Sequence, residues 1–127
     1  MSIEWQESFK IGDAEVDASQ AALFQLVNEI IENDDWIALR PKIIALFKQM
    51  QKQFDLEEAV MAKIGFADAR AHADAHKQLL MRVRDRSMDV GKGHMNKKAI
   101  VAVMTEWAQN HVTAEDAKLA RALAVAA

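Results

Sequence analysis

The chain has 127 residues, of which 51% are hydrophobic and 28% charged, and its formal net charge is −3. This composition is typical of one globular domain, residues 1–127, and excludes a disordered chain. The slight negative charge argues against a nucleic-acid or anionic-membrane partner. The absence of cysteine excludes disulfides, thiolate zinc sites and iron–sulfur clusters.

The N-terminal segment carries no sign of export. Residues 1–10 lack the basic stretch and following apolar run that mark a signal peptide. No apolar stretch approaches the roughly 18 residues that a membrane-spanning helix needs. We therefore expect a cytoplasmic location and no membrane partner.

Long helices are expected because only four glycines and one proline interrupt the chain. The first predicted helix covers about residues 18–33, with Asp17 as its N-cap. Its apolar face repeats at helical spacing: Leu23, Phe24, Val27, Ile30 and Ile31. The second helix is predicted with Pro41 in its first turn and with its end at about Lys63 or Ile64, before Gly65.

The third predicted helix covers about residues 67–90, and the fourth begins near Asn96. The β-branched pair Val112-Thr113 predicts a local break, after which a short helix takes residues 114–125. The first dozen residues form an arm laid across the helices. The sequence therefore predicts an all-α fold, an up-down-up-down four-helix bundle with an N-terminal arm and a short C-terminal helix.

Seven polar side chains interrupt the predicted apolar faces: Gln20, Gln53, Glu57, His72, His76, His111 and Asp116. Burying carboxylates or imidazoles without partners costs several kcal/mol, so such groups are rarely scattered through a core. All four helices contribute to this set. The seven residues are therefore best explained as one cluster whose members satisfy one another.

The spacing within this set indicates a metal site. His72 and His76 are one helical turn apart, so both imidazoles can bind one ion. No Lys or Arg lies on the predicted inward faces to neutralise Glu57 and Asp116, whereas a divalent cation would. The alternative is a hydrogen-bonded polar core. The sequence lacks the Glu that directly follows the first His in zinc peptidases, which argues against peptidase activity. It also lacks the Glu-x-x-His pairs of ferritin-like bundles, which argues against a di-iron site of that kind.

Four parts of the chain resemble the bacteriohemerythrins, bacterial members of the non-haem di-iron hemerythrin family. These parts are Trp5 with Gly12-x-x-x-Val16-Asp17, Gln53-Phe-Asp-Leu-Glu57-Glu-Ala-Val-Met61, His72-x-x-x-His76, and Trp107-x-x-x-His111-x-x-x-x-Asp116. The last two match the family's ligand segments at identical spacing. Together the four parts extend over nearly the whole chain.

The resemblance implies a role for five of the polar residues. His72, His76 and His111 would be the terminal ligands of one iron. Glu57 and Asp116 would bridge this iron to a second one. In the family, the second iron carries two histidines and keeps the open position where oxygen binds.

The two histidines of the second iron fall on Gln20 and Gln53 in this sequence. An amide oxygen is a weaker ligand for ferrous iron than imidazole, so we expect one iron per chain rather than two. Reversible O2 binding is then expected to be weakened or lost, with room for a small diatomic ligand or an anion on the remaining iron. A glutamine amide can also donate to a carboxylate oxygen that no longer bridges.

Two other functions stay open at this point. The first is a metal-free bundle with a structural or signalling role and a hydrogen-bonded polar core. The second is a mononuclear iron enzyme acting on superoxide, peroxide or nitric oxide, because three histidines and a carboxylate also resemble the ligands of iron superoxide dismutases. The resemblance favours a binding protein over an enzyme, and the sequence does not indicate an oligomeric state.

Overall fold

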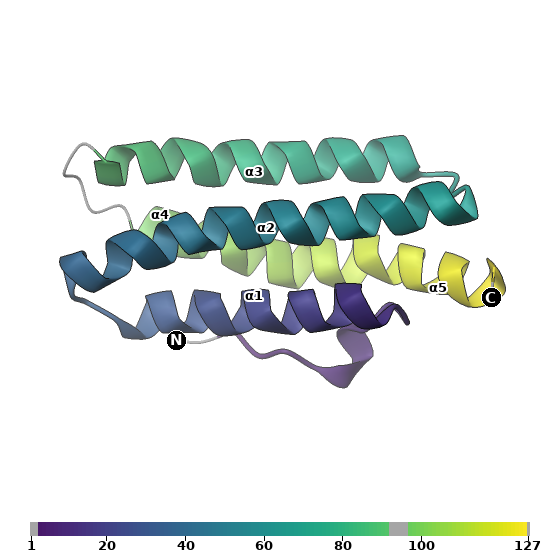
Figure 1. Ribbon diagram of the computed structural model, residues 1–127, viewed down its shortest axis with the longest axis horizontal. Helices are drawn as coiled ribbons and strands as arrows, with labels where there is room; N and C mark the ends of the chain where they lie inside the picture. The colour runs from purple at the N-terminus through teal and green to yellow at the C-terminus, as the bar shows by residue number, and fades with distance from the viewer. Residues whose placement is uncertain (1–2, 92–96, 127) are drawn as a thin grey trace.

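The computed structural model describes residues 3–91 and 97–126, and Figure 1 shows them as helical rods lying side by side. The elements are η1 (Glu7–Phe9), α1 (Ala14–Glu32), α2 (Trp36–Ile64), α3 (Ala69–Gly91), α4 (Lys97–Glu106), the π-helix η2 (Trp107–Glu115) and α5 (Asp116–Ala126). α4, η2 and α5 form one continuous rod, which we call the fourth rod, and α1, α2 and α3 are the other three rods of the bundle. The described residues contain no strand, and the predicted all-α four-helix bundle is confirmed.

The first helix begins earlier than the sequence predicted. α1 starts at Ala14, and its N-cap is Asp13, whose side chain accepts the N–H of Val16 at 3.1 Å. The predicted N-cap, Asp17, instead lies buried in the first turn. Its carboxylate accepts the backbone N–H groups of Ile11 (2.8 Å) and Gly12 (3.3 Å), so it fastens the N-terminal arm to the bundle.

The second helix also begins earlier than predicted. α2 starts at Trp36 after the N-cap Asp35, which places Pro41 beyond the first turn. Proline has no N–H, so the carbonyl of Ile37 lacks its usual helical donor. Ile37 is 79% exposed, which lets water supply that hydrogen bond. The predicted end at Gly65 is confirmed, with φ at +64° in the left-handed region that favours glycine.

The predicted break at Val112-Thr113 is wrong. The chain stays helical through these residues, because the wider turns of η2 carry it from α4 into α5. The backbone N–H of Asp116 donates to the carbonyl of His111, the five-residue step of a π-helix. The predicted start of the fourth helix near Asn96 lies outside the described residues.

The core consists of two apolar clusters with polar residues between them. The larger cluster includes Leu23, Phe24, Met50, Phe54 and Trp107. The smaller cluster contains Ile11, Val16, Val60, Met61 and Leu119. Along α2, Glu57 lies between Phe54 and Val60, and along α1, Gln20 lies between Val16 and Leu23. The polar side chains therefore occupy the middle of the bundle.

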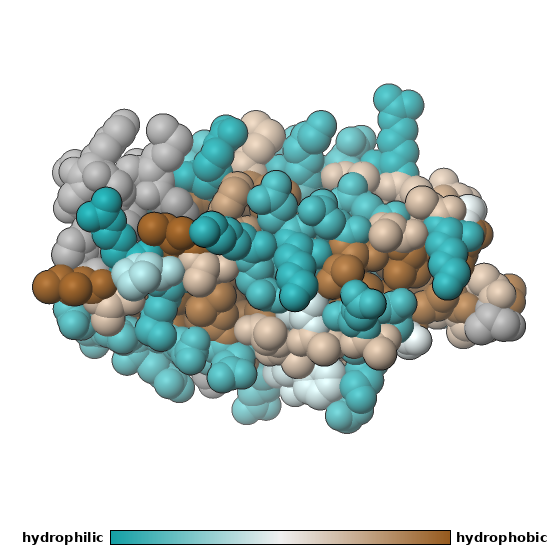
Figure 2. Space-filling view, viewed as in Figure 1, coloured by the Kyte–Doolittle hydropathy of each residue, from teal (hydrophilic) through white to brown (hydrophobic). Residues whose placement is uncertain are grey.

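The N-terminal arm packs along the outside of the larger cluster. Its Trp5 and Phe9 contact that cluster, and the backbone of Ile3 exchanges two hydrogen bonds with the side chain of Asn28, at 2.8 and 2.7 Å. On the face in Figure 2, hydrophilic side chains are interleaved with apolar patches. No helix among the described residues is long and apolar enough to cross a membrane.

Candidate metal centre

All seven polar side chains singled out from the sequence are buried. Gln20, Gln53 and Glu57 are 0% exposed, His72, His76 and Asp116 are 1% exposed, and His111 is 5% exposed. Five of them converge: Glu57, His72, His76, His111 and Asp116 each offer one ligand atom, and these atoms all lie within 4.8 Å of one another. We call these five residues the donor cluster.

Three of the four rods supply the donor cluster. α2 carries Glu57, and α3 carries His72 and His76 one turn apart. The rod formed by α4, η2 and α5 carries His111 and Asp116. The two histidine rings of α3 meet edge to face, with their centroids 4.5 Å apart.

The π-helix explains how His111 and Asp116 face the same way. In an α-helix, positions five apart point about 140° away from each other. In a π-helix, the hydrogen bond itself joins residues five apart, so their side chains lie on one face. The wide turns of η2 therefore bring the imidazole and the carboxylate together, and the Nε2 of His111 lies 3.1 Å from the Oδ1 of Asp116.

The donor atoms face a common point. Glu57 Oε1 lies 3.1 Å from the Nε2 of His72 and 3.3 Å from the Nε2 of His76. Asp116 Oδ1 lies 3.0 Å from the Nε2 of His72, and the Nε2 atoms of His76 and His111 are 3.1 Å apart.

Hydrogen bonds cannot satisfy all the acceptor atoms that these contacts bring together. Two imidazole nitrogens that face each other can share only one proton, and a carboxylate accepts but does not donate when ionised. Although Asp116 lies within ion-pair distance of two histidines, neither of its oxygens makes a well-aligned hydrogen bond within the described part of the chain. Buried lone pairs that converge in this way suit a bound cation.

Burial and charge shift the pKa values of the cluster in different directions. Burial would raise the pKa of Glu57, but hydrogen bonds inside the cluster, first of all the one with His72, outweigh it and hold this pKa well below its usual range. Burial and the charge of Glu57 raise the pKa of Asp116. Burial opposes a charge on His72, yet Asp116 and Glu57 raise its pKa to about 9. Without a cation, protons therefore balance the charges of the cluster.

The two glutamines lie outside the donor cluster. Gln53 Nε2 donates to Glu57 Oε2 at 2.8 Å, which is the amide–carboxylate bond expected from the sequence. Gln20 Oε1 accepts the indole N–H of Trp5 at 2.9 Å. The other amide atoms, Gln20 Nε2 and Gln53 Oε1, are buried and find no partner among the described residues.

Two residues beside the donor cluster were missed by the sequence analysis. Glu58 Oε2 lies 3.0 Å from the Nδ1 of His76, on the side of the ring that faces away from the cluster. Phe54 stacks on the same imidazole, with ring centroids 4.0 Å apart and planes 3° from parallel. The signal that could have found both is their position directly next to Gln53 and Glu57 in the sequence.

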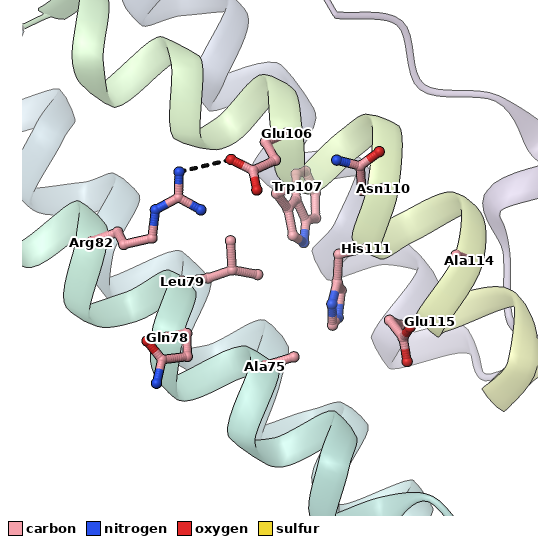
Figure 3. A pocket seen from close by; sticks show the side chains of 10 residues that line it. All are labelled: Ala75, Gln78, Leu79, Arg82, Glu106, Trp107, Asn110, His111, Ala114 and Glu115. Atoms are coloured by element: carbon pink, nitrogen blue, oxygen red, sulfur yellow. Dashed lines mark hydrogen bonds and ion pairs between the residues drawn. The ribbon is translucent and has the colours of Figure 1, made fainter.

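A groove between α3 and the fourth rod borders the donor cluster (Figure 3). The groove has a volume of about 340 Å³, and His111 lies on its wall beside Leu79 and Trp107. An ion pair between Arg82 and Glu106, 2.7 Å long, spans the two helices there. His111, the most exposed of the five, is thus the member that borders this groove.

Sequence comparison finds relatives for nearly the whole chain. A bacteriohemerythrin of Ralstonia nicotianae is 27% identical over 117 residues, which cover 90% of this chain and 83% of the relative. A myohemerythrin of Riftia pachyptila is 26% identical over 114 residues, which cover 90% and 88%. Comparison with profiles of known protein families gives no match.

Structure comparison finds the same kind of protein. The crystal structure of a hemerythrin mutant superposes with a TM-score of 0.86 and covers 97% of this chain and 98% of its own. The sequence identity of that pair is 23%, so this match concerns the fold.

Proposed function

Since this chain is hemerythrin-like in sequence and in fold, we propose that it is a non-haem iron-binding protein that holds one iron per chain. The three imidazoles of His72, His76 and His111 are the nitrogen ligands. Glu57 and Asp116 supply the carboxylate ligands. The observation that carries the proposal is the convergence of these five buried donor atoms within 4.8 Å.

The chemistry of the donors suits this metal. Imidazole and carboxylate together form a common ligand set for iron outside haem, and two carboxylates balance the charge of a ferrous ion. Histidines are the only ion-pair partners found for Glu57 and Asp116 in the described part of the chain. A cation would replace the protons that otherwise balance the charges of the buried carboxylates.

The contacts of the two glutamines support one iron rather than two. A carboxylate that bridges two metals needs one oxygen for each. In this chain Glu57 turns Oε1 to the histidines, while Oε2 accepts the N–H of Gln53. The oxygen of Gln20 is engaged by Trp5, which leaves its N–H2 group as the free end, and an N–H2 group cannot bind a cation.

A single iron changes the expected chemistry. Reversible O2 carriage in hemerythrins draws one electron from each of two irons, so we propose that it is weakened or lost here. With five protein donors, the ion would have room for one further ligand, which could be water, a small diatomic molecule or an anion. The protein's own part is to hold the ion among buried side chains, of which His111 is the most exposed.

Elemental analysis of the purified protein after loading with ferrous iron tests this proposal. We expect one iron per chain, and two after the double substitution Gln20→His with Gln53→His, which restores two imidazoles. His111→Ala is the matched loss of a ligand and should lower the iron content. Two irons in the unsubstituted chain would contradict the single-metal proposal, and none would contradict the metal-binding proposal.

A further inference from the structure

His76 lies between two consecutive carboxylates of α2. Glu57 Oε1 is 3.3 Å from its Nε2, and Glu58 Oε2 is 3.0 Å from its Nδ1. Neighbouring positions of an α-helix differ by about 100°, so one carboxylate points into the bundle and the next lies at its edge. Glu58 is accordingly 40% exposed, while His76 is 1% exposed.

The two imidazoles of α3 differ in their outer nitrogen. The Nδ1 of His72 is buried and finds no partner among the residues that the structure describes. The Nδ1 of His76 has the carboxylate of Glu58. His76 is also the only ion-pair partner seen for Glu58 in residues 3–91 and 97–126.

We propose that Glu58 is a positioning residue that sets the tautomer of His76 and strengthens it as a ligand, an inference that rests on the proposed iron site. A neutral imidazole carries a proton on one nitrogen and a lone pair on the other. An ionised carboxylate can only accept, so Glu58 keeps the proton on Nδ1. The lone pair is then on Nε2, the atom that faces the donor cluster.

Phe54 completes the arrangement. Its ring stacks on His76 with planes 3° from parallel and therefore fixes the plane of the imidazole. Stacking alone does not choose which nitrogen carries the proton, because Phe54 contacts the face of the ring and both nitrogens lie on its edge. The carboxylate on the outer edge makes that choice, and its charge also raises the electron-donating strength of the inner nitrogen.

The test compares Glu58→Gln and Glu58→Ala with the unsubstituted chain and with Asp55→Asn. Asp55 is a suitable control because it is an exposed carboxylate on the same helix. Competition with a chelator measures the affinity for ferrous iron. We expect a loss of roughly 10- to 100-fold for Glu58→Ala, a smaller loss for Glu58→Gln, whose amide oxygen still accepts, and no change for Asp55→Asn.

A second measurement does not depend on iron. In the ¹⁵N spectrum of the metal-free protein near neutral pH, His76 is expected to carry its proton on Nδ1, and Glu58→Ala should remove this preference. An unchanged tautomer, or an iron affinity that stays within about twofold in Glu58→Ala, overturns the proposal. If the chain binds no iron while the tautomer still depends on Glu58, the proposed function fails and the positioning contact stands.

Discussion

His72 is the side chain on which the two buried carboxylates meet. Its Nε2 lies 3.1 Å from Glu57 and 3.0 Å from Asp116, and these neighbours raise its pKa to about 9 against the cost of burial. In the metal-free protein His72 is therefore protonated at neutral pH. Iron binding needs the neutral imidazole. A rise in pH therefore removes stability from the metal-free protein through His72, and it favours iron binding through the same residue.

We expect the metal-free protein to lose stability as the pH rises from about 6.5 to 9. A group whose pKa is raised on folding stabilises fully below its ordinary value, 6.5 for histidine, and loses this contribution as the pH passes its folded value. The shift of His72 sets an upper limit of about 3 kcal/mol. The raised pKa of Asp116 acts in the same direction.

Urea unfolding with a chelator present, at pH 6 and at pH 9, measures this effect. The midpoint should fall at the higher pH, and His72→Gln should flatten the dependence. A midpoint that rises or stays constant in the unsubstituted protein would show that His72 is neutral in the metal-free cluster.

The donor cluster could be predicted residue by residue because each member breaks an apolar pattern. Burying Glu57 or His111 costs free energy, so a carboxylate or an imidazole at an expected core position stands out from the apolar pattern. Glu58 gives no such signal, since a half-exposed glutamate on a helix is ordinary. The bond from Trp5 to Gln20 was equally hidden, because the position of the arm depends on the assembled bundle.

At the scale of the elements, the helices were predictable and their ends were not. Asp17 and Asp13 are both good N-cap residues, and only the folded arm decides between them by using Asp17 to hold Ile11 and Gly12. The π-helix was misread as a break because β-branched residues weaken an α-helix without saying what replaces it. The five-residue spacing of His111 and Asp116 was the overlooked signal.

The π-helix predicts different effects of a deletion and an insertion on iron binding. Deleting the exposed Thr113 should turn η2 into an α-helix in which the two ligands are four apart and still share a face, so iron binding is retained. Inserting one alanine after Thr113 should turn Asp116 away by roughly 100° and lower the iron content. Iron per chain and helical circular dichroism measure both, and loss of iron only in the deletion would refute this reading of η2.

For the whole molecule, the donor cluster joins rods that already pack on either side of it. The larger apolar cluster lies on one side and the smaller cluster around Leu119 on the other. The bundle therefore has an apolar core without any metal. An ion held by α2, α3 and the fourth rod would add a cross-link in the middle of that core.

Thermal unfolding with and without a chelator separates an iron protein from a metal-free structural or signalling bundle. Iron at about 100 times its dissociation constant stabilises by roughly 2.7 kcal/mol, which corresponds to about 10 °C in Tm for a domain of this size. We expect the chelator to lower the Tm of the unsubstituted protein by this order and to leave His111→Ala unchanged. Equal Tm values for the unsubstituted protein would mean that the buried cluster works as a hydrogen-bonded core, since a ligand that binds only the folded state must raise its stability.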